Sequence, residues 1–337
     1  MTSRRRFLQA GLGHGAIMTL AAAQTWLGAL PLARAQSVPD KVTLQLNWLK
    51  DSQHGGHFVA IEKGFFRDEG IDCEVIAGGP GVDSIGLVAS GRAMLGDRDS
   101  SNVILARLKG IPIKGFAATY QRNPFSMVSL KAKPVKSLEE MVGKTVAIPT
   151  QRRGPLNAVL KRKGIDPATV NFVPTGGDAS VLASGQVDAY FGWTTTEALV
   201  LQRRGVELYF VPVDELGDPS YAQVIFATDE TLQTQSDLLL RWVRAEIKGW
   251  SWMADHPEET ARMVVEKYGR SGLDLDGEIA KAKATGPYLR APGERVLWID
   301  SAIFESGKRL AIESGIKARD VPVADMFTQS LVRQAHG

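Results

Sequence analysis

The sequence predicts an α/β protein of two lobes that ends in a helical C-terminal segment. Short apolar strands alternate with helical patterns over much of the chain, which is typical of parallel strands covered by helices. The alternation restarts at Ser137, so we expect a second, smaller α/β unit there. Helical patterns alone follow from Leu238, which suggests that the chain returns to the first lobe. The expected lobes are residues 40–127 with 228–337, and residues 128–227.

Length and composition narrow the function classes. The 337 residues suffice for two cores, and 44% hydrophobic with 23% charged residues is ordinary globular usage. Arg4, Arg5, Arg6 and Arg34 lie in the first 35 residues without any acid, and the rest of the 40 Lys+Arg nearly balances the 37 Asp+Glu. Bulk charge therefore gives no support to nucleic-acid binding. The single Cys73 excludes an intrachain disulfide and a Cys-rich zinc site.

Residues 1–35 have the pattern of an export signal. The string Ser3-Arg-Arg-Arg-Phe-Leu8 precedes an uncharged stretch to Ala33, and Ala33-Arg34-Ala35 offers a cleavage site. The string is similar to a twin-arginine signal. The stretch is long enough for a membrane anchor, but its glycines and polar residues weaken that alternative. We therefore expect a soluble protein in the periplasm, beginning near Gln36.

The first lobe is expected to alternate strands and helices up to its last strand. Gly64, Gly91 and Gly110 follow the three helical patterns as C-terminal stops. The expected strands are Val42–Asn47, Ile71–Ile76, Ala93–Gly96 and Ile113–Thr119. The expected helices are Gly55–Lys63, Val82–Ala89 and Ser101–Leu108.

The second unit begins at a capping box, Ser137-Leu-Glu-Glu140, which opens a short helix. Pro155 suits the first position of a helix that continues to Lys163. The other expected helices are Ala179–Ser184 and Glu197–Arg203. The expected strands are Thr145–Ile148, Val170–Val173, Val187–Phe191 and Glu207–Val211.

The C-terminal segment shows apolar residues at helical spacing, for example at Leu240, Val243, Ile247 and Trp250. Two extended segments, Phe125–Leu130 and Gln223–Ala227, are expected to connect the lobes. The expected helices of the segment are Leu238–Met253, Pro257–Tyr268, Leu273–Ala284, Val296–Ser314 and Ala324–Ala335.

An ordered set of motifs resembles one protein family. The set begins with Asn47-Trp48, His54-Gly-Gly-His57-Phe-Val-Ala60, Lys63-Gly64-Phe-Phe66 and Glu69-Gly70-Ile71. It continues with Val88-Ala-Ser-Gly-Arg92, Gly143-Lys144-Thr145-Val146, Ala183-Ser-Gly-Gln-Val-Asp-Ala189 and Gly249-Trp250. The family is that of ABC-transporter solute-binding proteins for thiamine-pyrimidine precursors, riboflavin, alkanesulfonates, taurine and nitrate. The resemblance implies the type II periplasmic-binding fold, with a ligand cleft between the lobes.

The same resemblance implies a periplasmic receptor of an ABC importer that captures a small heterocyclic or aromatic molecule by hinge closure. The implied partners are this ligand and a permease in the inner membrane, with a monomeric receptor and no cofactor. The family's usual Trp-x-Pro-Asn opening is absent from Trp48-Leu-Lys-Asp51, which leaves the ligand open. A receptor for an aromatic carboxylate or alkanesulfonate is one alternative, and a sensor that docks on a membrane kinase is another.

An enzyme of pyrimidine synthesis on the same fold is a further alternative. The eukaryotic synthase of this fold carries a Cys-rich motif, which Cys73 alone cannot supply. The chain also lacks a Gly-x-Ser-x-Gly elbow, a Walker loop, a His-Glu-x-x-His motif and a dinucleotide fingerprint. We therefore expect no catalytic and no metal-binding residues.

Candidate ligand residues are those at the carboxyl ends of strands and at the helix starts that follow. Asn47 and Trp48 close the first strand, where the indole can stack on a flat ring; the alternative is a core tryptophan. His54 and His57 flank two glycines at a helix start and either bond a ligand or serve the helix start. A metal there needs a further ligand beyond the nearby Asp51.

Further candidates occupy the same kind of position, and each has a structural alternative. Arg152 and Arg153 suit a carboxylate, sulfonate or phosphate, or else form a solvated basic turn. Trp193 is expected to face Trp48 as an aromatic clamp. The remaining candidates are Asp97, Asp99, Ser100, Tyr120, Gln151, Gly176, Gly177, Asp178, Glu197 and Tyr221.

Overall fold

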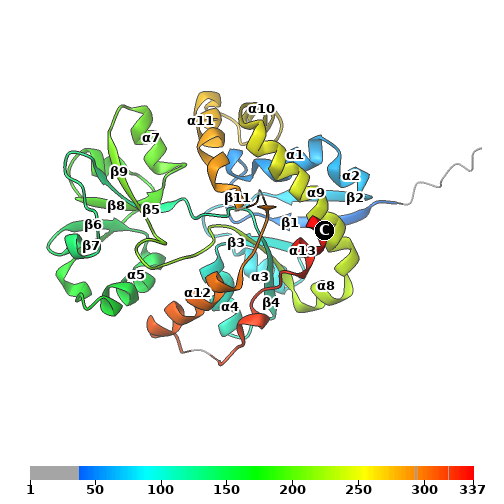
Figure 1. Ribbon diagram of the computed structural model, residues 1–337. Helices are drawn as coiled ribbons and strands as arrows, with labels where there is room; N and C mark the ends of the chain where they lie inside the picture. The colour runs from blue at the N-terminus through cyan, green and yellow to red at the C-terminus, as the bar shows by residue number, and fades with distance from the viewer. Residues whose placement is uncertain (1–37, 292, 294, 318) are drawn as a thin grey trace, which may run out of the picture. The chain divides into compact units, whose positions relative to one another are not determined.

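Two five-stranded sheets organise the part of the chain that the structure describes (Figure 1). The computed structural model describes residues 38–291, 293, 295–317 and 319–337. Residues 38–337 form one unit by their contacts. The export signal expected at residues 1–35 lies outside the described residues.

The first sheet has the strand order β2-β1-β3-β10-β4. Strands β1, β2 and β3 are parallel, and β10 runs antiparallel between β3 and β4. Its strands are β1 (Asp40–Gln45), β2 (Ile71–Ile76), β3 (Leu95–Arg98), β4 (Ile113–Ala118) and β10 (Val224–Thr228).

The second sheet repeats this arrangement with the order β7-β6-β8-β5-β9. Strands β6, β7 and β8 are parallel, and β5 runs antiparallel between β8 and β9. Its strands are β5 (Phe125–Leu130), β6 (Thr145–Ile148), β7 (Asn171–Pro174), β8 (Ala189–Trp193) and β9 (Leu208–Pro212).

The prediction that Phe125–Leu130 and Gln223–Ala227 connect the lobes is wrong. Phe125–Leu130 is strand β5 and residues 224–227 belong to β10, each inside its sheet. Both runs are apolar and buried almost throughout, so they gain more as central strands than as exposed connectors. The connections between the sheets are instead residues 119–124 and 213–223, which we call the first and second crossover. They meet where the Thr119 N–H donates to the Gln223 carbonyl at 3.1 Å.

Helices cover both faces of the first sheet: α1, α2 and α9 lie on one side, and α4 and α12 on the other (Figure 1). The helices associated with this sheet are α1 (Gly55–Glu62), α2 (Phe65–Asp68), α3 (Ser84–Ala89), α4 (Ser100–Leu108), α8 (Asp229–Thr234), α9 (Ser236–Asp255), α10 (Pro257–Met263), α11 (Leu275–Thr285), α12 (Ser301–Glu313) and α13 (Ser330–His336). Those of the second sheet are α5 (Thr150–Arg162), α6 (Ser180–Ala183) and α7 (Glu197–Arg203).

Three helix starts differ from the prediction by five residues or more. Helix α5 begins at Thr150, so Pro155 lies inside it rather than at its first position. Helix α12 begins at Ser301 because the Asp300 carboxylate caps it by accepting from the Ala302 N–H, and Val296 instead ends the short strand β12 (Arg295–Val296), which pairs with β11 (Arg290–Ala291). The helix predicted at Ala324–Ala335 begins only at Ser330, as α13.

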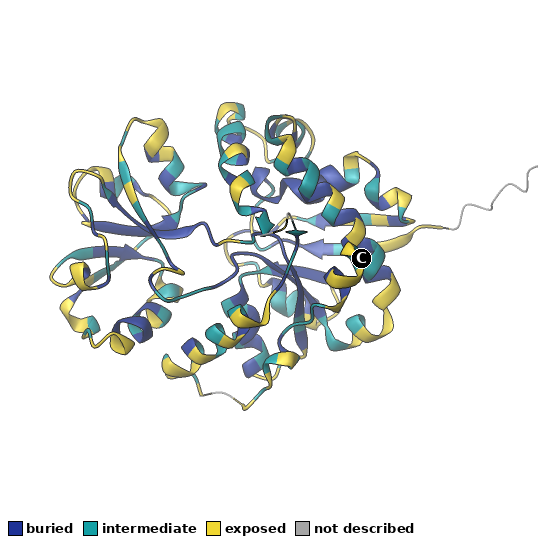
Figure 2. Cartoon of the chain, in the orientation of Figure 1, coloured by how far each residue is buried: buried dark blue, intermediate teal, exposed yellow. Residues whose placement is uncertain are grey.

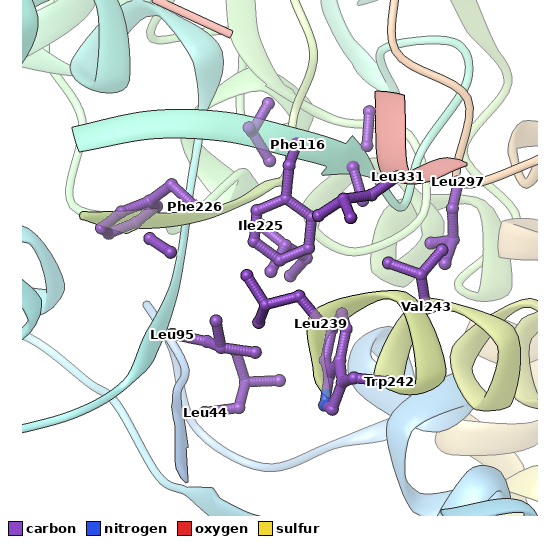
Figure 3. Close-up of a cluster of buried hydrophobic side chains, with 14 of the residues drawn as sticks. Leu44, Leu95, Phe116, Ile225, Phe226, Leu239, Trp242, Val243, Leu297 and Leu331 are labelled. Atoms are coloured by element: carbon purple, nitrogen blue, oxygen red, sulfur yellow. The ribbon is translucent and has the colours of Figure 1, made fainter. Parts of the chain in front are cut away.

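The main core lies between the first sheet and α9. Leu239, Trp242 and Val243 of α9 pack toward Leu44, Phe116 and other sheet residues (Figure 3). The central strands are mostly buried, while the outer helix faces are exposed (Figure 2). A separate core lies beside the second sheet, and Leu310 of α12 belongs to it. Helix α12 therefore ties the C-terminal segment to the second sheet's core.

None of the described helices is both long enough and apolar enough to cross a bilayer.

Candidate functional site

A cleft of about 1450 Å³ opens at the carboxyl ends of strands from both sheets. Parallel strands leave their carboxyl ends and the following helix starts on one edge, which explains why polar turns gather there. The predicted site residues that line the cleft are Asn47, Trp48, Asp99, Gln151, Arg152, Gly177, Trp193 and Glu197.

Two tryptophans line this cleft from different sheets. Trp48 follows β1 and is 44% exposed, so it is not a core residue. Trp193 ends β8 and lies edge-on to Tyr120 of the first crossover, with ring centroids 5.6 Å apart. The cleft thus presents a flat apolar surface on each side.

Polar atoms without partners lie on the same walls. The Thr195 hydroxyl is buried, and neither it nor the Asn47 Oδ1 has a hydrogen-bond partner among the described residues. Glu197 Oε2 accepts from the Trp193 N–H at 3.0 Å and from the Thr196 hydroxyl. A ligand with both donors and acceptors would find partners for each at this wall.

Asp51, Gln53, Glu278 and Lys281 line one part of the cleft, which we call the cleft floor. An ionic network there joins Asp51 to α11. Lys281 Nζ lies 2.8 Å from Asp51 Oδ2 and 2.7 Å from Glu278 Oε1. Glu278 Oε2 in turn accepts from the Ser52 N–H at 2.8 Å. Burial lowers the pKa of Lys281, but the two carboxylates outweigh it and raise that pKa above its usual value. Lys281 therefore stays an ammonium.

His54 lies behind this floor, fully buried between two carboxylates. Its Nε2 is 3.4 Å from Asp97 Oδ2, and its Nδ1 is 3.7 Å from Asp51 Oδ1. Burial by itself lowers the pKa of His54, but Asp51 and Asp97 reverse this and raise the pKa to about 9. For Asp51, burial raises the pKa, and His54 and Lys281 together bring it down to about 2. His54 and Asp97 are not on the cleft wall.

We expect the free energy of unfolding to fall as pH rises from about 6.5 to 9. A histidine whose pKa is raised on folding stabilises the protein below its unfolded pKa and loses this contribution through its folded pKa near 9. The unfolding free energy should fall by about 3 kcal/mol. The lowered pKa of Asp51 reflects the same interaction with His54, so it contributes no separate loss. Urea unfolding across this range measures it, with His54→Gln as the control that should lose the slope. An equal slope in His54→Gln would contradict this assignment.

His57 lies in the core, away from the cleft. Its Nδ1 is 2.7 Å from Glu246 Oε2 on α9, and the Trp250 Nε1–H donates to the same oxygen at 2.8 Å. We therefore leave His57 out of the proposed site.

Several other predicted residues are engaged elsewhere. The Ser100 hydroxyl accepts from the Tyr221 N–H at 3.0 Å, which joins α4 to the second crossover. Tyr120 is fully buried. The Asp178 carboxylate accepts from the Ser180 N–H and hydroxyl, and neither Asp178 nor Gly176 is on the cleft wall.

The two arginines predicted to bind an anion have different surroundings. Arg152 is on the cleft wall, but it lies 3.6 Å from Asp218 Oδ2 and over the Phe125 ring at 4.9 Å. Arg153 is not on the wall and lies over the Phe172 ring. Acidic and basic side chains are equally numerous on the described cleft wall, six of each. The acidic ones are Asp51, Asp83, Asp99, Glu197, Asp274 and Glu278, and the basic ones are Lys50, Arg98, Arg152, Arg203, Arg270 and Lys281.

The described side chains of the cleft and its surroundings do not form a metal-binding group. No group of three or more His, Cys, Asp or Glu side chains within residues 38–291, 293, 295–317 and 319–337 is placed to hold a metal ion.

Comparison with known proteins identifies the family. The family model described as NMT1/THI5 like matches residues 51–260, which include Asp51 of the cleft floor and much of both sheets. The chain belongs to the NMT1/THI5-like family. The resemblance seen in the sequence motifs is thereby confirmed.

Some relatives of this NMT1/THI5-like chain are named as binding proteins and others as enzymes. The formylaminopyrimidine-binding protein of Halalkalibacterium halodurans is 30% identical over 271 residues, covering 78% of this chain and 80% of the relative. The riboflavin-binding protein RibY of Chloroflexus aurantiacus is 25% identical, covering 72% and 69%. A 4-amino-5-hydroxymethyl-2-methylpyrimidine phosphate synthase of Legionella pneumophila is 23% identical, covering 68% and 74%. The family thus includes binding proteins and proteins named as enzymes.

A solved structure confirms the fold class. The periplasmic aliphatic sulphonate-binding protein SsuA of Escherichia coli superposes with a TM-score of 0.67 at 12% identity, covering 86% of this chain and 92% of that one. The α/β fold of this NMT1/THI5-like chain, with its helical C-terminal segment, is therefore that of periplasmic binding proteins.

Sequence reasoning missed the contribution of the C-terminal segment to the cleft. Glu278 and Lys281 stand three residues apart on a helix, which is also the spacing of an ordinary surface ion pair. Tyr190 and Phe191 of β8 also line the cleft but have the pattern of core strand residues. No local signal distinguishes either pair from its ordinary structural role.

Proposed function

We propose that this chain is a solute-binding receptor of an ABC importer that closes around a small heterocyclic or aromatic molecule, such as a thiamine pyrimidine precursor or a flavin. The observation that carries the proposal is the cleft with Trp48 and Trp193 on walls from different sheets. Flat rings gain dispersion and hydrophobic contact between two indoles. The names of the relatives that bind formylaminopyrimidine and riboflavin point to the same ligand class.

Hinge closure is the proposed mechanism, with the two crossovers absorbing the bend. Polar contacts between segments of the two sheets support it. Arg203 of α7 lies 3.1 Å from Asp274 at the cleft mouth, and the Thr194 hydroxyl lies 2.8 Å from the Tyr288 hydroxyl beside the first crossover. Each is a polar contact near the surface that can break and reform at small cost.

The proposed location is the periplasm, reached by the twin-arginine route. The leader at residues 1–35 supports this proposal. The proposed partner is an inner-membrane permease that recognises the closed monomer.

A pyrimidine-phosphate synthase is the second candidate, because relatives bear that name. Covalent amine chemistry requires a neutral lysine, whereas Lys281 in the cleft floor is held as an ammonium by two carboxylates, which argues against Lys281 as the reacting amine. The relatives that are 30% and 25% identical are named as binding proteins. This favours a receptor without catalytic activity.

A thermal-shift panel of pyrimidines, flavins, aromatic carboxylates and alkanesulfonates tests the proposed ligand class. A true ligand at about 100 times its dissociation constant stabilises the folded state by roughly 2.7 kcal/mol. A heterocycle should raise the melting temperature. A response to acids or sulfonates alone would overturn the heterocycle assignment and move the centre of the site toward Arg152.

Replacing Trp48 by alanine should weaken binding of the panel's best ligand roughly thirtyfold, or about 2 kcal/mol, with little change in melting temperature. The side chain is 44% exposed and lines the cleft, so it contributes more to a ligand than to the core. Calorimetric titration measures the affinity. Trp252→Ala is the matched control, since Trp252 lies against Lys63 and His256, outside the cleft. Equal affinity in Trp48→Ala and wild type would remove Trp48 from the site.

A further inference from the structure

The turn that forms the cleft floor also contacts both crossovers. Asp51 faces the cleft, the Gln53 carbonyl accepts from the Tyr120 hydroxyl at 3.2 Å, and His54 Nε2 lies 3.1 Å from Gln223 Nε2. Tyr120 belongs to the first crossover and Gln223 to the second. The Thr119 hydroxyl, at the start of the first crossover, lies 2.9 Å from Gln223 Oε1. One short turn therefore connects the ligand-facing floor to both segments that join the sheets.

We propose that His54 is a positioning residue that couples the cleft floor to the crossovers, and that it does not contact the ligand. This inference rests on the proposed function as a receptor that closes on its ligand. His54 is fully buried and absent from the cleft wall, whereas its partner Asp51 lines the wall and holds Lys281.

The charge on His54 fixes this arrangement. Both Asp97 oxygens are buried without a hydrogen-bond partner among the described residues, so the imidazole 3.4 Å away supplies the compensating charge. A protonated imidazole donates from both nitrogens. The Gln223 amide then presents its oxygen to His54 and its NH₂ to Thr119, which requires only a half-turn of the amide. The proton thus holds Asp51, Asp97 and the second crossover in one geometry.

His57 provides a natural comparison three residues further on. It is equally buried and carries its own carboxylate partner, Glu246, at 2.7 Å. Its ring neighbours are Trp242 and Trp250 of α9, not a crossover. If any buried histidine beside a carboxylate in this lobe controlled the hinge, the two histidines would behave alike. The proposal requires that they differ.

Spin labels across the cleft mouth test the proposal without a ligand. We choose Arg204→Cys, directly after α7, and Asp276→Cys on α11, because both positions are exposed and lie within two residues of the Arg203–Asp274 contact. The labels are placed in a Cys73→Ala background of the purified protein. The interlabel distance distribution is recorded for the otherwise wild-type protein and for His54→Gln, Gln223→Met and His57→Gln. His54→Gln and Gln223→Met should broaden the distribution toward longer distances, and His57→Gln should leave it unchanged.

The pH dependence separates a positioning role from a general structural one. The groups that face His54 are Asp51, Asp97 and Gln223, with Lys281 and Glu278 behind Asp51 and a neutral Tyr120 beside the turn. As His54 loses its proton near pH 9, the otherwise wild-type and His57→Gln distributions should broaden, and His54→Gln should show no such transition. Unchanged distributions in His54→Gln and Gln223→Met, or equal broadening in His57→Gln, would overturn the proposal. If His54→Gln does not fold, Gln223→Met against His57→Gln decides in the same way.

A binding experiment with formylaminopyrimidine as the probe tests whether the position of the crossovers affects ligand affinity. His54→Gln and Gln223→Met should bind it about tenfold more weakly than wild type, a coupling of usual size for linked sites. Unchanged affinity in both variants would overturn the coupling to the cleft. Failure of the wild-type protein to bind any member of the ligand panel would count against the proposed function, while the label distances still decide the role of His54.

Discussion

Replacing Glu246 by alanine is expected to lower the free energy of unfolding by about 3–5 kcal/mol, because it leaves buried polar groups without a partner. Glu246 is fully buried, and one of its oxygens receives both the Trp250 N–H at 2.8 Å and the His57 ring at 2.7 Å. The His57 contact joins α1 to α9 on one face of the first sheet, while the Trp250 bond lies within α9. Urea unfolding followed by circular dichroism measures the loss.

Glu246→Gln is the matched variant. Its amide oxygen can still accept from the Trp250 N–H and from the His57 ring, so the loss should be smaller than in Glu246→Ala. Glu266→Ala, at an exposed position, should change the unfolding free energy by less than about 0.5 kcal/mol. Equal losses in Glu246→Ala and Glu266→Ala would show that the buried network contributes nothing.

Replacing Gly78 by alanine is expected to cost about 1–3 kcal/mol of stability and to weaken ligand binding at the same time. A Cβ at this position would lie 2.3 Å from the Leu46 carbonyl oxygen and 2.6 Å from the Trp48 nitrogen. These are backbone atoms, so the strand end that carries Trp48 must move. The Gly78 N–H also donates to the Trp48 carbonyl at 2.8 Å, which fixes the two segments together.

Gly176→Ala is the control, because a Cβ there meets nothing within 4 Å. Thermal unfolding and calorimetric titration of both variants measure the two effects. If Gly78→Ala loses stability but keeps full affinity, the position of Trp48 does not depend on this contact.

The order of strands and helices could be predicted because its signals are local. Alternating apolar residues and glycine stops identified most elements of both sheets within a few residues. The roles of Phe125–Leu130 and Gln223–Ala227 could not be predicted, because a central antiparallel strand and an apolar connector have the same sequence pattern. Their difference lies in pairing with strands that are distant in the chain.

The candidate site shows the same division between local and distant information. Trp48 and Trp193 could be placed in the cleft because each follows a predicted strand. His54 and His57 have nearly the same local sequence, and only their distant partners, Asp97 and Gln223 for one and Glu246 for the other, separate their roles. Lys281 came from a helix more than 200 residues beyond Asp51 in the chain.

Calorimetric titration of the purified protein with formylaminopyrimidine and with riboflavin, followed by mass spectrometry of the recovered ligand, tests most directly whether this chain is a receptor. A receptor predicts saturable one-to-one binding of one of them, reversed on dilution, with the ligand recovered unchanged. Apolar burial between the indoles also predicts a negative heat-capacity change. Chemical conversion of the ligand, or no binding of either compound, would contradict the assignment of this chain as a receptor for a heterocycle.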